Sequence, residues 1–272
     1  MAGSSDGTWR GKVVLLTGAS EGIGRALALE LAPRGARLAL VARNAERLEA
    51  LAAECRALGA DARAVPADLG RLESVAGVVE ATLAAFGRLD VLVNNAGMTM
   101  WSRFDALQDL GVLEQLMRVN YLASAWLTQA ALPQLRRDAG LIVAVASVAG
   151  LTGVPERTGY AASKHAMIGF FESLRIELAG SGVDVTIIAP DFVRSEIHRR
   201  AIGADGRPLG ETPMQESRIM TAEHCAHEIR EAMEARQRLR VTSGRARWGL
   251  RLKPFLPALI DWIAARAIRE RR

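Results

Sequence analysis

A short apolar run leads directly into a cluster of glycines in Lys12-Val13-Val14-Leu15-Leu16-Thr17-Gly18-Ala19-Ser20-Glu21-Gly22-Ile23-Gly24. The run is rich in β-branched residues, which favour a buried strand, and residues 25–34 that follow have helical periodicity. A strand, a glycine-rich turn and a helix in this order aim backbone N–H groups and a helix N-terminus at one point, as phosphate binding requires. Glycines also serve plain tight turns, but the elements on both sides favour a nucleotide site at 18–24.

Apolar runs and helical segments continue to alternate along the chain. Further strands are predicted at 37–41, 62–67, 89–93, 141–146, 183–189 and 239–242. This alternation predicts an α/β fold, a Rossmann-like doubly wound parallel sheet of about seven strands with helices on both faces. Half of the 272 residues are hydrophobic, which is enough for one large core. We therefore expect a flexible tail at 1–11, a single domain at 12–244 and a basic amphipathic extension at 245–272.

The net charge of +5 is concentrated at the C-terminal end. Eleven basic and two acidic residues lie from Arg236 to Arg272, which leaves the rest of the chain with a net charge of −4. A nucleic-acid-binding protein usually carries its positive charge on the folded face, so no nucleic acid is expected as a partner. The two cysteines, Cys55 and Cys225, lack the spacing of metal ligands, which predicts reduced thiols in a cytoplasmic protein and no metal site.

The predicted strand at 37–41 ends at Ala42-Arg43-Asn44, where a dinucleotide fold selects its cofactor. An acidic residue at this place would accept hydrogen bonds from the ribose 2′-OH, whereas an arginine pairs with a 2′-phosphate. Ala42 replaces the acid and Arg43 follows it, so the sequence favours NADP(H) over NAD(H). The alternative is that Arg43 only leads into a helix at 45–58 capped by Asn44.

Tyr160 and Lys164 are four residues apart in a segment with helical character. Side chains at this spacing share one helix face, so the lysine charge is expected near the phenol. A neighbouring positive charge lowers the pKa of a tyrosine and prepares it for general acid/base work. Alone, the pair is more typical of a partly exposed helix face. It gains meaning from Ser147, which follows the apolar run 141–146, because ligands bind at the carboxyl ends of parallel strands.

Together these motifs resemble the short-chain dehydrogenase/reductase family over about two thirds of the chain. The resemblance rests on Thr17-Gly18-x3-Gly22-x-Gly24, on Asn94-Asn95-Ala96-Gly97, and on Ser147 placed thirteen residues before the Tyr160-x3-Lys164 pair. It implies hydride transfer between NADP(H) and a carbonyl/alcohol pair. The cofactor would supply the hydride, and the protein would supply position and electrostatics.

The resemblance implies catalytic roles for four residues. Tyr160 would donate a proton to the carbonyl oxygen in reduction, or remove it from the alcohol in oxidation. Lys164 would lower the tyrosine pKa and hold the nicotinamide ribose. Ser147 would orient the substrate oxygen. Asn120, in the helical stretch 110–137, would kink that helix and hold a water of the proton relay.

The resemblance also implies which residues bind the cofactor. They come from the glycine-rich turn, the strand ends and the active-site helix: Gly18, Ser20, Gly22, Ile23, Gly24, Arg43, Asp68, Leu69, Asn94, Ala96, Gly97, Tyr160, Lys164, Pro190, Val193 and Ser195. Asp68 could also cap the helix that follows it. The chain departs from the family pattern at Ser195, which replaces threonine but keeps the hydroxyl, and at Asp191, which replaces glycine. The aspartate is expected to alter the loop and to place a charge near the nicotinamide or substrate.

Residues 197–220 have little periodicity and several glycines and prolines. Their position after the nicotinamide-binding segment predicts a substrate lid. With Met98-Thr99-Met100-Trp101 and the residues after Gly150, the lid would line an apolar pocket, so we expect a lipophilic ketone or secondary alcohol as the small-molecule substrate. The resemblance implies a homodimer or homotetramer. Two other functions stay open: a non-catalytic NADP(H)-binding redox sensor, and a membrane-surface scaffold.

The extension 245–272 carries an apolar stripe at helical spacing, and its prolines place the start of a helix near Phe255. Charged residues interrupt the stripe, so it falls short of the roughly 18 unbroken apolar residues that a membrane span needs. Trp248, Trp262 and the arginines suit a helix that lies on a membrane surface, which would make the protein peripheral at the membrane. We favour the alternative, a helix that packs on its own domain or on a second subunit, because core-packing stripes are commoner.

Overall fold

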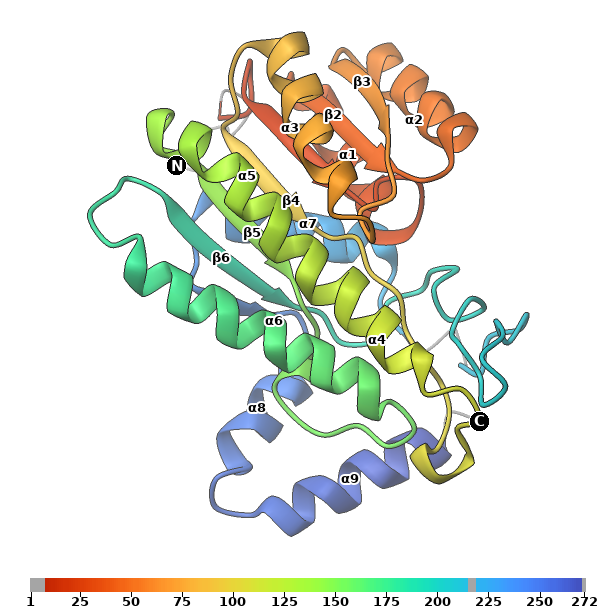
Figure 1. Ribbon diagram of the computed structural model, residues 1–272. Helices are drawn as coiled ribbons and strands as arrows, with labels where there is room; N and C mark the ends of the chain where they lie inside the picture. The colour runs from red at the N-terminus through yellow and green to blue at the C-terminus, as the bar shows by residue number, and fades with distance from the viewer. Residues whose placement is uncertain (1–7, 215–218, 271–272) are drawn as a thin grey trace.

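A seven-stranded parallel sheet runs through the centre of the computed structural model, which describes residues 8–214 and 219–270 (Figure 1). The strands follow the order β3-β2-β1-β4-β5-β6-β7, and every neighbouring pair is parallel. They are β1 (Val13–Thr17), β2 (Arg37–Ala42), β3 (Asp61–Pro66), β4 (Val91–Asn94), β5 (Leu141–Val145), β6 (Asp184–Ala189) and β7 (Leu239–Val241). The predicted Rossmann-like doubly wound fold is confirmed.

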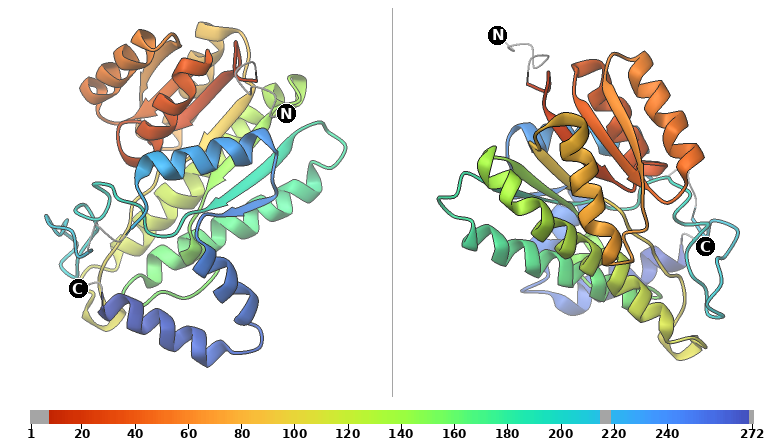
Figure 2. Two further views of the ribbon diagram at one scale, coloured as in Figure 1. Left: turned by 180° about the vertical axis from the view of Figure 1, so that it is seen from behind. Right: turned by 45° about the horizontal axis from the view of Figure 1, so that its top comes forward.

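Helices cover both faces of this sheet (Figures 1 and 2). They are α1 (Gly22–Leu31), α2 (Ala45–Ala57), α3 (Glu73–Phe86), α4 (Gly111–Met117), α5 (Ala123–Arg137), α6 (Thr158–Glu177), α7 (Ala222–Glu234), α8 (Gly244–Leu252) and α9 (Pro257–Arg269). Helices α1, α2 and α7 share one core cluster, and α3, α5 and α6 share the other. Alternate residues of β1 serve the two layers: Val14 packs into the first cluster, and Val13 into the second.

The strand order reverses between β1 and β4. One half of the sheet grows outward from β1 to β3, and the other from β4 to β7. At such a switch point the loops leave the carboxyl ends in opposite directions and open a crevice in which ligands bind. The glycine-rich turn 18–24 follows β1 and the segment 95–97 follows β4, so both predicted motifs lie at this crevice.

Several helix boundaries agree with the capping chemistry of the sequence. The Asn44 side chain accepts a hydrogen bond from the third residue of α2, and Thr221 does the same at the start of α7. Asp68 does not cap α3, which begins at Glu73 without a side-chain cap. The long helix predicted at 110–137 is divided, because residues 118–122 form a π-helical segment around Asn120. Single π turns inside helices often mark functional sites.

Trp9 corrects the prediction of a flexible tail at 1–11. Residues 1–7 lie outside the described part of the chain, but Trp9 is buried and its Nε1 donates to Glu234 Oε1 over 2.7 Å. The ring belongs to the core cluster that contains residues of α1 and α7. A single aromatic residue in a short polar segment has no periodicity, so its burial could not be predicted from the pattern.

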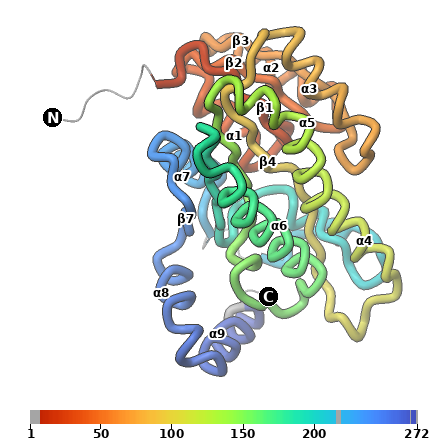
Figure 3. Tube along the Cα trace, turned by 60° about the vertical axis from the view of Figure 1, so that its left-hand side comes forward, coloured from red at the N-terminus to blue at the C-terminus, as the bar shows by residue number. Residues whose placement is uncertain are grey.

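Helices α8 and α9 form a pair that lies beyond the last strand, next to the carboxyl edge of the sheet (Figures 1 and 3). Helix α9 begins at Pro257, close to the predicted start, whereas α8 was not predicted. Ile268 of α9 is buried in a cluster with Trp101 and Ala201, so the extension packs on its own domain through one face. Within the described residues, no helix has both the length and the apolar character needed to cross a bilayer.

Candidate active site

A cavity of about 1150 Å³ opens at the carboxyl edge of the sheet. Its walls come from the glycine-rich turn, the loops after β2 to β6, the start of α6, the lid, and helices α8 and α9. Most of the predicted site residues line it: Gly18, Ser20, Gly22, Ile23, Arg43, Asp68, Leu69, Ala96, Gly97, Ser147, Tyr160, Lys164, Pro190, Val193 and Ser195. Gly24, Asn94 and Asn120 do not line the cavity, but they contact residues close to its wall.

The glycine-rich turn is so compact that side chains would not fit in it. Gly18 has a φ of +63°, and a Cβ there would lie 2.9 Å from the Ala96 Cα. A Cβ on Gly24 would lie 2.2 Å from the Gly18 carbonyl oxygen, so only glycine lets α1 start directly against the turn. The two glycines leave a cradle of backbone atoms at the N-terminus of α1, which fits the phosphates of a dinucleotide.

Asn95 holds this cradle together and was not predicted as a site residue. Its Nδ2 donates to the carbonyl oxygens of Thr17 and Gly18 over 2.9 and 3.2 Å. Asn94, which was predicted to bind the cofactor, is instead buried and donates to Thr128 Oγ1 over 3.0 Å. The reason is strand geometry: Asn94 is the last residue of β4 and points into the α5 layer, whereas Asn95 already belongs to the loop.

Arg43 follows β2 and lines the cavity with an exposed side chain. It has no hydrogen-bond or ion-pair partner within the described residues, so its guanidinium is available to a phosphate. Glu21, the acidic residue of the glycine-rich turn, is paired with two arginines. Arg47 of α2 lies 3.4 Å from its carboxylate, and Arg200 of the lid forms a second ion pair.

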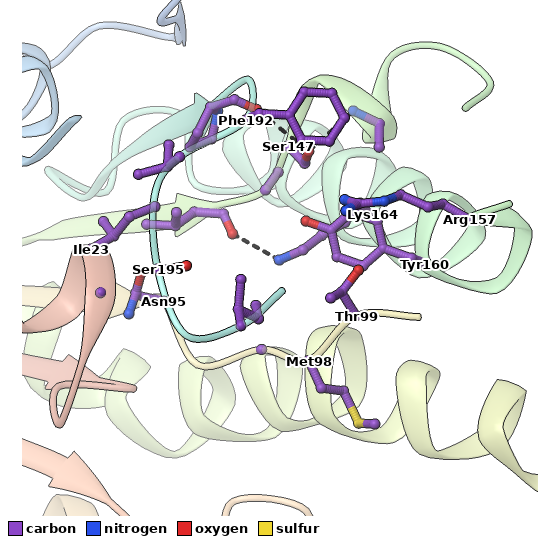
Figure 4. Close-up of a pocket in the computed structure, with 18 of the residues that line it drawn as sticks. Ile23, Asn95, Met98, Thr99, Ser147, Arg157, Tyr160, Lys164, Phe192 and Ser195 are labelled. Atoms are coloured by element: carbon purple, nitrogen blue, oxygen red, sulfur yellow. Dashed lines mark hydrogen bonds between the residues drawn. The ribbon is translucent and has the colours of Figure 1, made fainter. Parts of the chain in front are cut away.

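Tyr160, Lys164 and Ser147 meet in one part of the cavity (Figure 4). Helix α6 carries Tyr160 in its first turn and Lys164 one turn later, and the Lys164 Nζ lies 6.0 Å from the centre of the tyrosine ring. The same Nζ donates to the Val145 carbonyl oxygen over 2.9 Å, which ties α6 to the end of β5. Ser147 follows β5, hydrogen-bonds to Tyr160, and accepts a hydrogen bond from the Ala149 amide.

Burial shifts the pKa values of Tyr160 and Lys164 in opposite directions. It raises the pKa of Tyr160 above its usual value, although the hydrogen bond with Ser147 and the charge of Arg157 act in the opposite direction. Burial lowers the pKa of Lys164 to about 8. The net shift of the tyrosine pKa is upward, and the neighbouring charge that acts against it here is that of Arg157. A lowering of the tyrosine pKa by Lys164 stays a prediction. A phenol that stays protonated at neutral pH is suited to donate a proton.

Asn120 is buried behind the site and clamps the segment after β4. Its Oδ1 accepts a hydrogen bond from the Met98 amide over 2.8 Å, and its Nδ2 donates to the Met98 carbonyl oxygen over 3.0 Å. Nδ2 also donates to Ser163 Oγ, which in turn donates to the Tyr160 carbonyl oxygen. Asn120 therefore links the floor of the cavity to the helix that carries Tyr160.

The loop after β6 faces both the glycine-rich turn and the residues that were predicted to be catalytic. A Cβ on Gly22 would lie 3.0 Å from the Ser195 Cβ, so the loop and the glycine-rich turn approach each other closely. The Pro190 carbonyl oxygen accepts a hydrogen bond from the Val148 amide over 2.9 Å, next to Ser147. These contacts make the loop one wall of the crevice in which the two halves of the sheet meet.

Asp191 occupies the cavity wall, but its charge is not left facing the substrate. Ser243 donates to its carboxylate over 2.9 Å, and Arg245 forms an ion pair with it at 2.6 Å. Both partners belong to the start of α8. The predicted effect of the aspartate on this loop is therefore of another kind: it connects the loop to the C-terminal extension.

Arg157 is a charged residue of the site that the sequence did not reveal. It is buried, lines the cavity, and lies over the rings of Trp101, Phe192 and Tyr160, at 4.3, 5.0 and 5.7 Å from their centres. Its Nη2 lies 3.4 Å from Nδ1 of His198 in the lid. These neighbours come from four separate segments, so no local pattern around the arginine could have predicted them.

The predicted lid, 197–220, lines the cavity with residues such as Ile197 and Pro208. It contains no regular helix or strand in its described part, and residues 215–218 lie outside that part. Isolated bridges hold it, above all the pairing of Ile202 with Met100 in the segment after β4. The Arg200–Glu21 ion pair joins it to the glycine-rich turn. The lid therefore contacts both the cofactor side and the substrate side of the cavity.

Within the described residues, no group of three or more His, Cys, Asp and Glu side chains is placed to hold a metal ion. Cys55 and Cys225 are free and buried in the core cluster of α1 and α7. Burial raises the pKa of the Cys55 thiol to about 11. Both cysteines therefore serve as small apolar side chains of the core.

The chain belongs to the short-chain dehydrogenase family, because the model of the family described as short chain dehydrogenase matches residues 12–204. The protein is thus an oxidoreductase with a nucleotide-binding Rossmann fold, of a class that acts on CH–OH and C=O groups with a nicotinamide cofactor. Two curated relatives extend the similarity into the C-terminal region. 11-beta-hydroxysteroid dehydrogenase 1A of Arabidopsis thaliana is 39% identical over 259 residues, which cover 93% of this chain and 74% of the relative. A dehydrogenase/reductase SDR family protein 7-like of Drosophila melanogaster is 34% identical over 94% of this chain and 80% of its own.

Two solved structures share the fold. A short chain dehydrogenase/reductase from Burkholderia phymatum in complex with NAD superposes with a TM-score of 0.81 and 28% identity, over 92% of this chain and 95% of that one. An alcohol dehydrogenase from Thermococcus sibiricus, complexed with 5-hydroxy-NADP, gives a TM-score of 0.72 and 28% identity, over 85% and 94% of the two chains. Proteins with this fold therefore bind both types of nicotinamide dinucleotide.

Proposed function

We propose that this protein transfers a hydride between NADP(H) and a lipophilic ketone or secondary alcohol, with Tyr160 as the general acid/base. The observation that carries the proposal is the convergence of Tyr160, Lys164 and Ser147 on one cavity with the backbone cradle at Gly18. The nicotinamide supplies the hydride when it is bound. The protein positions the reactants and handles the proton.

In the reducing direction, the Tyr160 hydroxyl donates its proton to the carbonyl oxygen, and the Ser147 hydroxyl orients that oxygen by a hydrogen bond. The buried phenol is protonated at neutral pH and so is ready for this step. The phenolate that remains is stabilised by the charge of Arg157 and by the ammonium of Lys164, which would also hold the nicotinamide ribose. In the oxidising direction the same hydroxyl accepts the proton of the alcohol.

The environment of Arg43 supports NADP(H) as the cofactor. Ala42 leaves no acid to bind a ribose 2′-OH, and Arg43 is exposed at the cavity without a partner in the described part of the chain. Glu21 does not oppose a 2′-phosphate strongly, because Arg47 and Arg200 neutralise it. We therefore expect NADP(H) to bind more tightly than NAD(H).

The remaining wall of the cavity supports a lipophilic substrate. It is apolar and comes from the loops after β4, β5 and β6, the lid and the C-terminal helices: Met98, Val154, Phe192, Ile202, Trp248, Leu252, Ile260, Ile263 and Ile268. Relatives from Arabidopsis thaliana are named hydroxysteroid dehydrogenases, and a flat, polycyclic ketone suits a cavity with these walls. A small hydrophilic carbonyl compound would leave most of this apolar wall in contact with water, which is unfavourable.

A substitution of Tyr160 tests the mechanism. Tyr160→Phe removes the proton donor but keeps the ring, so we expect NADPH-dependent reduction of a panel of ketones to fall by about 10³-fold. NADPH binding, measured by fluorescence titration, should stay within about twofold, because the change removes one hydroxyl from a large binding site. If the variant keeps most of its activity, the tyrosine mechanism is wrong. If the wild type binds NADPH but turns over no ketone or alcohol of the panel, the redox-sensor function is favoured.

We further propose that α8 and α9 rest on an anionic lipid surface, which would make the protein peripheral at a membrane. Four large apolar side chains of the extension are exposed and do not line the cavity: Phe255, Leu256, Leu259 and Trp262. Arg251 and Arg266 lie over the rings of Trp248 and Trp262. Apolar and aromatic side chains flanked by arginines are typical of helices that lie in a membrane interface.

Vesicle co-sedimentation of the full chain tests this placement. Binding is expected to vesicles of phosphatidylcholine with phosphatidylserine, and to weaken in high salt, because part of the attraction is electrostatic. Pure phosphatidylcholine vesicles serve as the control for apolar contact alone. If neither vesicle retains the protein, the exposed face serves another purpose, such as contact with a second subunit.

A further inference from the structure

We infer that Asp191 is a positioning residue that fixes α8, a wall of the substrate cavity, to the loop that follows β6 and lies beside the catalytic serine. Three elements meet at its carboxylate: the loop after β6, the turn after β7 and the first turn of α8. The part of this inference that concerns substrates rests on the proposed function. The part that concerns α8 stands on the contacts alone.

Asp191 forms hydrogen bonds with Phe192, Thr242, Ser243 and Arg245, and we call this group of contacts the Asp191 clasp. Ser243 Oγ donates to Oδ2 over 2.9 Å, and Arg245 donates to the same oxygen from Nε and Nη2 over 2.8 and 2.6 Å. Oδ1 accepts a hydrogen bond from the Phe192 amide over 2.9 Å, and the Asp191 amide donates to Thr242 Oγ1. Charge-assisted bonds of this kind are stronger than neutral ones, and the arginine uses two N–H groups at once.

Helix α8 depends on this clasp because little else holds its first turn. None of its side chains is buried, and its first turn contains Arg245 but no acidic residue. Positive side chains at a helix N-terminus are unfavourable, since the helix dipole is positive there. The Asp191 carboxylate supplies the missing negative charge from another element. Ser243 completes the start of the helix by accepting a hydrogen bond from the Ala246 amide.

The clasp connects α8 with the catalytic centre at both of its ends. Next to Asp191, the Pro190 carbonyl oxygen accepts a hydrogen bond from the Val148 amide, the residue after the catalytic serine. Just beyond the other end of α8, Lys253 Nζ donates to the Leu151 carbonyl oxygen over 3.1 Å. Helix α8 therefore bridges two points that flank the same loop.

The consequence is a coupling between the cofactor side and the substrate side. Trp248 and Leu252 of α8 line the cavity, so a shift of α8 changes the surface offered to the substrate. The clasp transmits such a shift to the loop that includes Val193 and Ser195, which also line the cavity. Asp191 replaces the glycine of the family pattern, and a glycine at this position would offer no carboxylate to Ser243 and Arg245.

Hydrogen–deuterium exchange of the full chain tests the clasp without any substrate. We expect Asp191→Gly and Arg245→Gln to increase amide exchange in α8 by about tenfold, with a smaller increase for Asp191→Asn, which keeps the shape and loses the charge. Arg247→Gln removes a positive charge two residues further along α8 and should leave amide exchange in α8 unchanged. Exchange in α7 reports global stability and should not move. If α8 exchanges at the wild-type rate in Asp191→Gly, the inference is wrong.

Steady-state kinetics with NADPH tests the effect on substrates. Androstanedione is the bulky probe, which reaches the α8 wall, and cyclohexanone is the small one. Asp191→Gly should raise the KM for androstanedione several-fold and leave kcat/KM for cyclohexanone within about twofold, and Arg245→Lys should restore part of the loss seen in Arg245→Gln. An equal loss on both probes would overturn the positioning role. If even the wild type reduces no ketone, the proposed function fails, while the exchange experiment still decides whether the clasp exists.

Discussion

The cofactor side and the substrate side of the cavity are built on different physical principles. On the cofactor side, backbone packs against backbone: a Cβ on Gly24 would lie 2.2 Å from the Gly18 carbonyl oxygen. On the substrate side, side chains hold side chains, as in the ion pair between Asp191 and Arg245 at 2.6 Å. Arg245 is also largely exposed, so water screens part of that ion pair.

This difference predicts how each side responds to change. A close backbone contact leaves no room for a new atom and cannot relax without moving a strand. An exposed side-chain contact can be removed at small cost, and its loss shifts an element without unfolding it. Substitutions that add atoms to the close backbone contacts of the cofactor side should therefore abolish binding, whereas substitutions of exposed side chains should change selectivity. Four substitutions test this contrast.

Gly24→Ala should have the largest effect. The new methyl group would overlap the Gly18 carbonyl oxygen, so the start of α1 must move away from the turn and the phosphate cradle opens. We expect the affinity for NADPH to fall at least about 100-fold, since overpacking a tight site costs roughly 3 kcal/mol. Isothermal titration with NADPH measures the loss. Gly169→Ala on α6, where a Cβ meets nothing within 4 Å, is the control. Tight binding by the Gly24 variant would break the contrast between the two sides.

Lys164→Met should remove activity yet stabilise the fold. Burial lowers the pKa of Lys164 from 10.5 to about 8, which means that the folded state resists the ammonium that the unfolded chain accepts. Below pH 8 this burial destabilises the protein, and the destabilisation disappears as the pH rises from about 8 to 10.5. We expect the free energy of unfolding to rise by about 1–3 kcal/mol at pH 7 in the variant, and by much less at pH 10. Urea denaturation at the two pH values checks the sign. An equal change at both would show that packing, and not charge, is responsible.

These two expectations rest on features that the sequence shows with different clarity. The cradle could be predicted because a strand, a glycine-rich turn and a helix follow one another, and so could the placement of Tyr160 and Lys164 on one helix face. The direction of the tyrosine pKa could not, because burial and the charge of Arg157 depend on segments that only the fold brings together. The motif also could not show that Asn95, and not Asn94, holds the cradle.

The substrate side was harder to predict for a related reason. Helix α8 has nine residues and no buried side chain, and it is too short for its few apolar residues to define a period. The partners of Asp191 lie 52 and 54 residues further along the chain, and the aspartate was visible only as a departure from the family glycine. Contacts between side chains that are distant in the sequence cannot be recognised from the local residue pattern, whereas tight backbone turns can be recognised from their glycines.

Arg43→Ala should reduce the preference for NADPH over NADH by about tenfold, the value of one charge-assisted contact of roughly 1.5 kcal/mol. The reason is that Arg43 is the exposed guanidinium at the end of β2, where the 2′-phosphate of a bound NADP(H) would lie. The ratio of kcat/KM for the two cofactors is the measurement. The substitution should leave NADH kinetics nearly unchanged, because the uncharged 2′-OH of NADH forms no ion pair with the guanidinium. If kcat/KM falls equally with NADPH and NADH, Arg43 has a structural role only. A preference for NADPH would then have to come from other residues.

Phe255→Ser should have the smallest effect on the fold and a visible one on membranes. Phe255 is 80% exposed, so its replacement should change the free energy of unfolding by less than about 0.5 kcal/mol. Ile260→Ser, five residues on and only 8% exposed, is the matched control and should cost about 2–4 kcal/mol. If the outer face of the extension meets lipid, Phe255→Ser should lower the fraction bound to phosphatidylserine vesicles several-fold, because about 1.5–3 kcal/mol of apolar burial is lost. Reduction of cyclohexanone in solution should not change. A variant that keeps full vesicle binding would leave the extension with one role only, as the wall that the Asp191 clasp holds against the substrate.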